Sequence, residues 1–322
     1  MKTAKIKKES RTNLEAGIQH QYHGVSIFRF MEVKIKNLKA SHRLGTAKNY
    51  RSAMASLQEF TGGRDLSFRK LSAGFMAQYS DYLRSKGLVK NSISFHMRIL
   101  RAVYNQASRE GLVEAGINPF SNVYTGVDNT RKRAIDKGII RRIKDLDLSQ
   151  SKALLLTRDL FLFSLYTRGM SFVDIAFLKR ENISDGEIYY TRRKTKKPLT
   201  IRIEPCIQQI IDRYNGWGEE YLFPIVKSEN EREAYLQYRI SMAYHNRLLK
   251  RISKMLGLER GLTFYVARHS WATLARDSDV PISVISAGMG HSSERTTQIY
   301  LRQLENRLID NANHGILEQL GK

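Results

Sequence analysis

The sequence predicts a mainly α-helical protein with two helical domains and one small β-hairpin. Residues 25–118 carry apolar side chains about every 3.6 positions, in segments that begin at capping residues and end at glycines. A polar segment that contains proline and glycine, residues 119–135, separates this half from the rest. Residues 136–315 are again helical in pattern, and one stretch that alternates with period two interrupts them. A chain of 322 residues is long enough for two such domains.

Four helices are predicted in the first domain. Their apolar stripes cover residues 26–38, 45–63, 72–87 and 91–111. Thr46 and Ser72 are candidate N-caps of the second and third helices, and Asn91 or Ser92 is the candidate cap of the fourth. Glycines follow the last three helices. Four capped amphipathic helices predict a compact bundle.

The period-two stretch GEIYYTRRKTKKPLTIRIEP, residues 186–205, predicts a β-hairpin in the second domain. Ile188 and Tyr190 alternate with polar residues before the turn, and Leu199 and Ile201 do so after it. Lysine and arginine dominate the tip between the two strands. Helical patterns follow at residues 205–214, 234–257 and 263–278.

The charge of the chain indicates a polyanionic partner. Lysine and arginine number 54 against 31 acidic residues, which gives a formal net charge of +23. An excess of this size along a folded chain favours nucleic acid, although a ribosomal-type basic protein is the alternative. The most apolar stretch, residues 153–166, is interrupted by Arg158 and Asp159, so no membrane span is expected. With one cysteine, Cys206, and a basic start that lacks an apolar core, we expect a cytoplasmic, nucleoid-associated protein.

Four motifs of the second domain occur in a characteristic order. They are YTRGMSFVDIAFLKREN (166–182), the basic hairpin tip, YVARHSWATLA (265–275) and GHSSERTTQIY (290–300). Together they resemble the tyrosine recombinases, or phage integrase family, over roughly residues 25–315. The resemblance implies an N-terminal four-helix core-binding domain of SAM-like fold, a linker at 119–135 and a catalytic domain at 136–315. Residues 1–24 are then a basic tail and residues 316–322 a C-terminal tail that completes its own domain or docks on another protomer.

The resemblance also implies roles for single residues. Tyr300, nine residues after His291, matches the nucleophile that forms a 3′-phosphotyrosine link with DNA. His291 matches the histidine-or-tryptophan position beside the scissile phosphate. Arg268 matches the second catalytic arginine, with His269 as its support, and Lys194 matches the hairpin lysine that protonates the leaving 5′-oxygen.

Two positions depart from the family pattern. Tyr265 occupies the slot that is normally histidine, and Ser171 occupies the slot of the first arginine. Arg168 lies three residues before Ser171, so it would reach the same face if this segment were helical. We therefore expect Arg168, Ser171 or Tyr265 to contribute to the site.

Further cations are predicted to contact the DNA backbone outside the reaction centre. They are Arg192, Arg193, Lys196 and Lys197 in the hairpin, Arg131, Lys132 and Arg133 in the linker, and Lys48, Arg51, Lys90 and Arg98 in the first domain. Guanidinium and ammonium groups bind phosphate without reading the base sequence.

No cofactor or metal is expected, because a covalent phosphotyrosine retains the broken phosphodiester and the chain contains no phosphate-binding loop or zinc-ligand spacing. The expected partners are double-stranded DNA and further copies of the chain, as a dimer or tetramer on DNA. Three alternatives remain open at this stage: a helical DNA-binding protein with a degraded site, a topoisomerase-like nicking and closing enzyme, and a metal-dependent nuclease or transposase.

Overall fold

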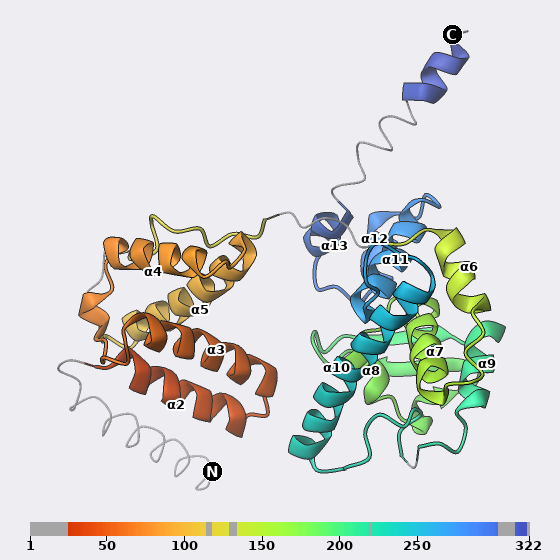
Figure 1. Ribbon diagram of the computed structural model, residues 1–322, viewed down its shortest axis with the longest axis horizontal. Helices are drawn as coiled ribbons and strands as arrows, with labels where there is room; N and C mark the ends of the chain where they lie inside the picture. The colour runs from red at the N-terminus through yellow and green to blue at the C-terminus, as the bar shows by residue number, and fades with distance from the viewer. Residues whose placement is uncertain (1–24, 114–117, 129–133, 219, 302–312, 321–322) are drawn as a thin grey trace, which may run out of the picture. The chain divides into compact units, whose positions relative to one another are not determined.

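The computed structural model describes residues 25–113, 118–128, 134–218, 220–301 and 313–320, apart from the side chains of Ile299 and Tyr300. Contacts divide the chain into two compact units, residues 1–130 and 131–322. The predicted fold class is confirmed, since helices dominate both units and the described residues form one small three-stranded sheet (Figure 1). The expected basic tail, residues 1–24, lies outside the described residues.

The first unit is a bundle of four α-helices. Its helices are α2 (Ile27–Ala40), α3 (Leu44–Phe60), α4 (Ala73–Ser85) and α5 (Lys90–Arg109), with a short 3-10 helix, η1, at Phe68–Lys70. Each α-helix buries one apolar stripe in a common core, and Tyr79, Met97 and Leu100 are among its most buried members. A serine caps α4 as predicted, because the Ser72 hydroxyl accepts a hydrogen bond from the Phe75 amide.

Two of the expected caps are wrong. Helix α3 begins at Leu44 after Arg43, so Thr46 lies inside its first turn. Helix α5 begins at Lys90 after Val89, so Asn91 and Ser92 lie inside its first turn. The side chain of Asn91 instead bonds to the backbone of Asp128. Its amide nitrogen donates to the Asp128 carbonyl (2.9 Å), and its oxygen accepts from the Asp128 amide (2.7 Å).

The beginning of the segment expected as a linker lies against the first unit. Phe120 is buried in the core of that unit, and Thr125 accepts a hydrogen bond from Arg101. The ammonium of Lys90 lies 4.5 Å from the centre of the Tyr124 ring. Residues 129–133, which include the predicted DNA contacts Arg131, Lys132 and Arg133, lie outside the described residues.

The second unit is built around α7, whose apolar side chains are buried on nearly all sides. Its helices are α6 (Lys137–Asp145), α7 (Lys152–Tyr166), α8 (Phe172–Ala176), α9 (Pro205–Arg213), α10 (Glu231–Met255), α11 (Phe264–Arg276), α12 (Ile282–Gly288) and α13 (Glu294–Leu301). Helices α6, α9, α10 and α11 pack around α7. The long apolar stretch of the sequence is therefore a core helix, and no helix within the described ranges could span a membrane.

The predicted hairpin is present as an antiparallel sheet of order β1-β2-β3. Its strands are β1 (Ile183–Ser184), β2 (Glu187–Thr191) and β3 (Pro198–Arg202), and a 3-10 helix, η2, precedes them at Arg180–Asn182. Ile188 pairs with Ile201, and both are buried in the core of the unit. Because strand side chains alternate between faces, Tyr190 shares the inward face of β2.

The carboxylate of Asp159 is a charged group that lies inside this core. Asp159 of α7 is 1% exposed and accepts hydrogen bonds from Arg158 (3.0 Å), Arg213 and the Tyr214 hydroxyl (2.8 Å). These bonds join α7 to the end of α9. Removing the carboxylate would leave its donors without their buried acceptor.

We expect Asp159→Ala to lower the free energy of unfolding by about 3 kcal/mol. Both tryptophans of the chain, Trp217 and Trp271, lie in the second unit, so their fluorescence during urea denaturation reports on that unit alone. Asp212→Ala, which removes an exposed carboxylate from α9, is the control and should cost about 0.5 kcal/mol or less. Equal stabilities of the two variants would contradict this role of Asp159.

Candidate active site

Arg268 of α11 and His291 of the turn between α12 and α13 meet in the structure. Arg268 is 6% exposed, and its guanidinium donates to the carbonyls of Gly169 (2.7 Å) and Met289 (2.6 Å). Its Nη2 also lies 3.1 Å from Nε2 of His291. Gly169 has a φ of +73°, and a β-carbon there would lie 2.8 Å from the α-carbon of Arg268. Glycine is therefore required for α11 to approach this loop so closely.

The contacts of His291 define its protonation state. Burial first, and after it the neighbouring cations, Arg268 foremost among them, together lower its pKa to about 4. Neutral His291 must face Arg268 with the lone pair of Nε2, because a guanidinium can only donate. Nδ1 then carries the proton and donates to Thr297, whose hydroxyl is 2.7 Å away. His291 thus holds Arg268 as a hydrogen-bond acceptor.

The turn of the hairpin lies against the same segment. Arg192 is buried and donates to the Gly290 carbonyl (2.8 Å), which also accepts from the Thr195 hydroxyl (3.1 Å). Lys194 is exposed at the tip, and its charge contributes to lowering the pKa of His291. The structure therefore brings Arg268, His291 and the basic hairpin to one place.

Ser171 has a structural contact in place of the missing arginine. Its hydroxyl donates to one carboxylate oxygen of Asp174 (2.6 Å). The other oxygen of Asp174 accepts the backbone amide of Arg193 (2.9 Å). Ser171, which occupies the slot of the first arginine, thus anchors the start of the hairpin turn through Asp174.

The condition for Arg168 and Ser171 to share a helix face, a helical segment between them, is not met. Helix α7 ends at Tyr166 and α8 starts at Phe172, so the residues between them do not form a helical turn. Arg168 has a φ of +58° and donates to the Thr200 carbonyl of β3 (3.2 Å). Arg168 nevertheless lies in the same neighbourhood as Arg268 and Arg192, since the charges of all three act on Tyr190 and favour its ionised form. Burial is the stronger effect and raises the pKa of Tyr190.

Tyr265 and His269 form an aromatic pair on α11. Their ring centres are 4.3 Å apart and nearly perpendicular, and Tyr265 is 52% exposed. Tyr300 lies in α13 by its backbone, and its side chain lies outside the described residues. Leu301, the next residue, is buried, residues 302–312 lie outside the described residues, and Ile316, Leu317 and Leu320 are exposed.

The remaining predicted DNA contacts lie on the surfaces of the two units. Lys48, Arg51 and Lys90 of the first unit are exposed, and Arg98 is half-buried. In the hairpin, Arg193 and Lys196 are exposed and Lys197 is half-buried. The guanidinium of Arg193 lies 3.9 Å from the centre of the Phe177 ring.

The sequence interpretation missed Thr297 and Asp174. Thr297 is fully buried and contacts His291, and Asp174 is buried beneath the hairpin. Polar residues of this kind carry no sequence signal for burial, because their burial depends on how the surrounding segments pack.

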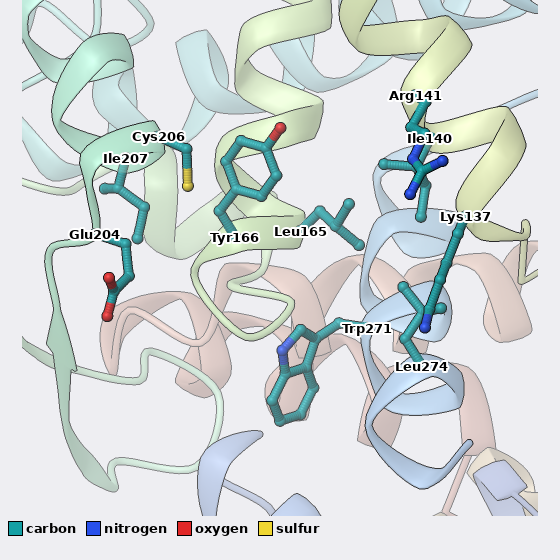
Figure 2. A pocket seen from close by; sticks show the side chains of 10 residues that line it. All are labelled: Lys137, Ile140, Arg141, Leu165, Tyr166, Glu204, Cys206, Ile207, Trp271 and Leu274. Carbon is teal, nitrogen blue, oxygen red and sulfur yellow. The ribbon is translucent and has the colours of Figure 1, made fainter. Parts of the chain in front are cut away.

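A separate groove of about 400 Å³ lies among α6, α7, α9 and α11 (Figure 2). Its walls include Leu165, Tyr166, Ile207, Trp271 and Leu274, with the ends of Lys137, Arg141 and Glu204 nearby. None of the predicted catalytic residues lines it. This apolar groove is therefore distinct from the cationic site.

Comparison with known proteins assigns both units. The model of the phage integrase SAM-like domain matches residues 26–123, and that of the phage integrase family matches residues 142–307. A tyrosine recombinase of Pseudothermotoga lettingae is 24% identical over 77% of this chain and 84% of its own length. Tyrosine recombinase XerD of Halalkalibacterium halodurans is 24% identical over 76% of this chain and 81% of its own. A lambda integrase fragment (residues 75–356), solved as a dimer bound to a COC′ core site, has the same fold, with a TM-score of 0.66, 17% identity and coverage of 86% and 95%.

The neutral state of His291 predicts a pH-dependent stability. Between pH 6.5 and 4 the unfolded chain binds a proton at this position and the folded chain does not, so the free energy of unfolding falls as the pH falls. In His291→Gln this contribution is absent. We therefore expect the stability difference between wild type and variant to shrink from pH 7 to pH 4, as measured by urea denaturation with tryptophan fluorescence. A difference that stays constant over this range would contradict the buried neutral state.

Proposed function

This chain belongs to the phage integrase family, and we propose that it is a site-specific recombinase that cuts and rejoins DNA through a 3′-phosphotyrosine link to Tyr300. The main support for this proposal is the buried pair of Arg268 and His291. The pair is held on the turn that leads into α13, and α13 contains Tyr300. A pair held in this way is a preorganised site for a phosphate close to the nucleophile.

The chemistry of phosphodiester cleavage explains why a cation is fixed here. Attack by the Tyr300 oxygen on phosphorus adds negative charge to the non-bridging oxygens of a pentacoordinate state. The planar, permanently charged guanidinium of Arg268 is suited to bind those oxygens. Because Arg268 is already held by two carbonyls and His291, it does not need to reorganise during the reaction. A preorganised donor of this type typically lowers the barrier by about 3–4 kcal/mol.

Two protons must move in the cleavage step. The phenol of Tyr300, with an ordinary pKa of about 10, loses its proton to solvent as the bond to phosphorus forms. The bond between phosphorus and the 5′-oxygen breaks, and Lys194 donates a proton to that oxygen. Religation reverses these transfers with the 5′-hydroxyl of a partner strand. The phosphotyrosine conserves the phosphodiester, so the reaction needs neither ATP nor a metal ion.

The positions that depart from the family pattern have different roles in this proposal. Arg168 adds positive charge to the site from the side of β3, and Ser171 positions the hairpin through Asp174. Tyr265, half exposed beside His269, supports the surface of α11 next to the site.

Double-stranded DNA and further copies of the chain are the proposed partners. The exposed cations of the first unit, Lys48, Arg51 and Lys90, fit phosphate contacts. Strand exchange joins two duplexes, so two or four copies act together in the cytoplasm at the nucleoid. Related proteins have been solved as a dimer on a core site and as a tetramer on a Holliday junction.

We expect wild-type protein to form a covalent adduct with DNA, and Tyr300→Phe to form none while it still binds DNA. The substrate is a library of nicked duplexes with a randomised segment. Cleavage near the nick releases a short fragment that diffuses away, so religation is prevented and the covalent adduct accumulates. Adducts that resist denaturing detergent are recovered and sequenced, which also identifies the cleavage site. EDTA should leave the yield unchanged. Binding by the wild type without an adduct would show a DNA-binding protein instead.

A second experiment identifies the general acid. Lys194→Ala should cleave the recovered duplex about 100-fold more slowly than wild type, because the leaving oxygen needs a proton. A 5′-bridging sulfur leaves as a thiolate without protonation, so it should restore the rate of Lys194→Ala to within about tenfold of wild type. Lys196→Ala, at the same exposed tip, is the control: the loss of a backbone contact should change the cleavage rates of both substrates equally, without a specific rescue by sulfur. The same pattern in Lys196→Ala, and not in Lys194→Ala, would assign the acid to Lys196.

A further inference from the structure

We propose that Arg192 supplies the second guanidinium of the site and binds a non-bridging oxygen of the scissile phosphate. This inference rests on the proposed recombinase function. It changes the role expected from the sequence, in which Arg192 was one of several backbone contacts at the hairpin. It also accounts for the missing arginine, because Ser171 holds that slot and bonds to Asp174.

Burial distinguishes Arg192 from the other cations of the hairpin. Its exposure is 7%, whereas its neighbours Arg193 and Lys194 are exposed. Within the described residues its guanidinium donates only to the Gly290 carbonyl, and its buried Nε has no hydrogen-bond partner. A buried guanidinium with an unused donor is costly in the free protein. An anionic oxygen bound there would satisfy the donor and neutralise the charge.

The position of Arg192 matches that of Arg268. Arg268 donates to the carbonyl of Met289, and Arg192 donates to the carbonyl of the next residue, Gly290. His291 follows directly, and both arginines lower its pKa after the larger effect of burial. The two guanidiniums are thus fixed on consecutive peptide groups of one turn, where one phosphate can contact both.

The glycine of this turn permits the approach of Arg192. Gly290 has a φ of +63°, and a β-carbon there would lie 3.1 Å from Cδ of Arg192 and 2.8 Å from a methyl carbon of Leu199. Any other residue would push the hairpin away from the turn. The close packing of hairpin and turn is therefore part of how Arg192 is placed.

The hairpin also directs Arg192 inward and Arg193 outward. The Arg193 amide donates to Asp174, which fixes the backbone at the first residues of the turn. Side chains alternate along this strand, so Tyr190 and Arg192 share the inward side. Arg193 instead packs on Phe177, with its guanidinium 3.9 Å from the ring centre. Arg193 is therefore not equivalent to Arg192, although it is equal in charge and adjacent in sequence.

The test compares Arg192→Ala and Arg192→Lys with Arg202→Ala on the duplex recovered with the wild-type protein. Arg202→Ala removes an exposed guanidinium from the end of β3 and is the control. Single-turnover cleavage should fall 100-fold to 1000-fold in Arg192→Ala and at least tenfold in Arg192→Lys, which loses the fork of donors. DNA affinity should change less than about threefold, because many other phosphate contacts remain. Arg202→Ala should cleave within about threefold of wild type. Cleavage by Arg192→Ala at the wild-type rate would overturn the proposal.

A modified substrate separates phosphate binding from a structural role. A methylphosphonate at the scissile position lacks the charged non-bridging oxygen, so it removes the need for a second cation. We expect Arg192→Ala to cleave this substrate at least tenfold faster than the normal duplex. Equally slow cleavage of both substrates would show that Arg192 only supports the fold, and would refute its role. Rescue of Arg168→Ala and not of Arg192→Ala would assign the role to Arg168. Absence of any adduct with wild type would refute the recombinase function itself.

Discussion

The turn at residues 289–291 is the constraint on which the site depends, because it holds positively charged side chains inside the protein. Arg268 donates to the Met289 carbonyl, and Arg192 donates to the Gly290 carbonyl. Buried cations are unstable unless polar groups surround them, and backbone carbonyls provide such groups without cancelling the charge. The turn therefore keeps a net positive charge inside the protein, supplied by one guanidinium from α11 and one from the hairpin.

The histidine of the site follows from the same arrangement. A buried imidazole beside arginines is held neutral, and a neutral imidazole can accept a hydrogen bond from a guanidinium. Thr297 fixes the tautomer from the first turns of α13. This hydrogen bond connects the turn, to which both arginines donate, with α13, the helix that contains Tyr300.

The slot of the first arginine has a structural role in this chain. Ser171 stands in the slot of the first arginine, yet it bonds to Asp174 and so fixes the beginning of the hairpin turn. Arg192, from that turn, lies buried where a second cation is useful. Phosphate binding requires a guanidinium at a point in space, and several segments of the chain can supply it.

The sequence by itself determined the helical bundle, the hairpin and the family, because periodicity, capping residues and motif order are local properties. It also indicated Arg268 and His291, which stand at their expected positions in the motifs. Only the tertiary structure decided that Thr297 and Asp174 are buried partners, that Arg168 lies outside a helix, and that Asn91 binds Asp128. The reason is physical. Burial, protonation state and hydrogen-bond partners depend on segments that are distant in the sequence, and no local pattern records which of them meet.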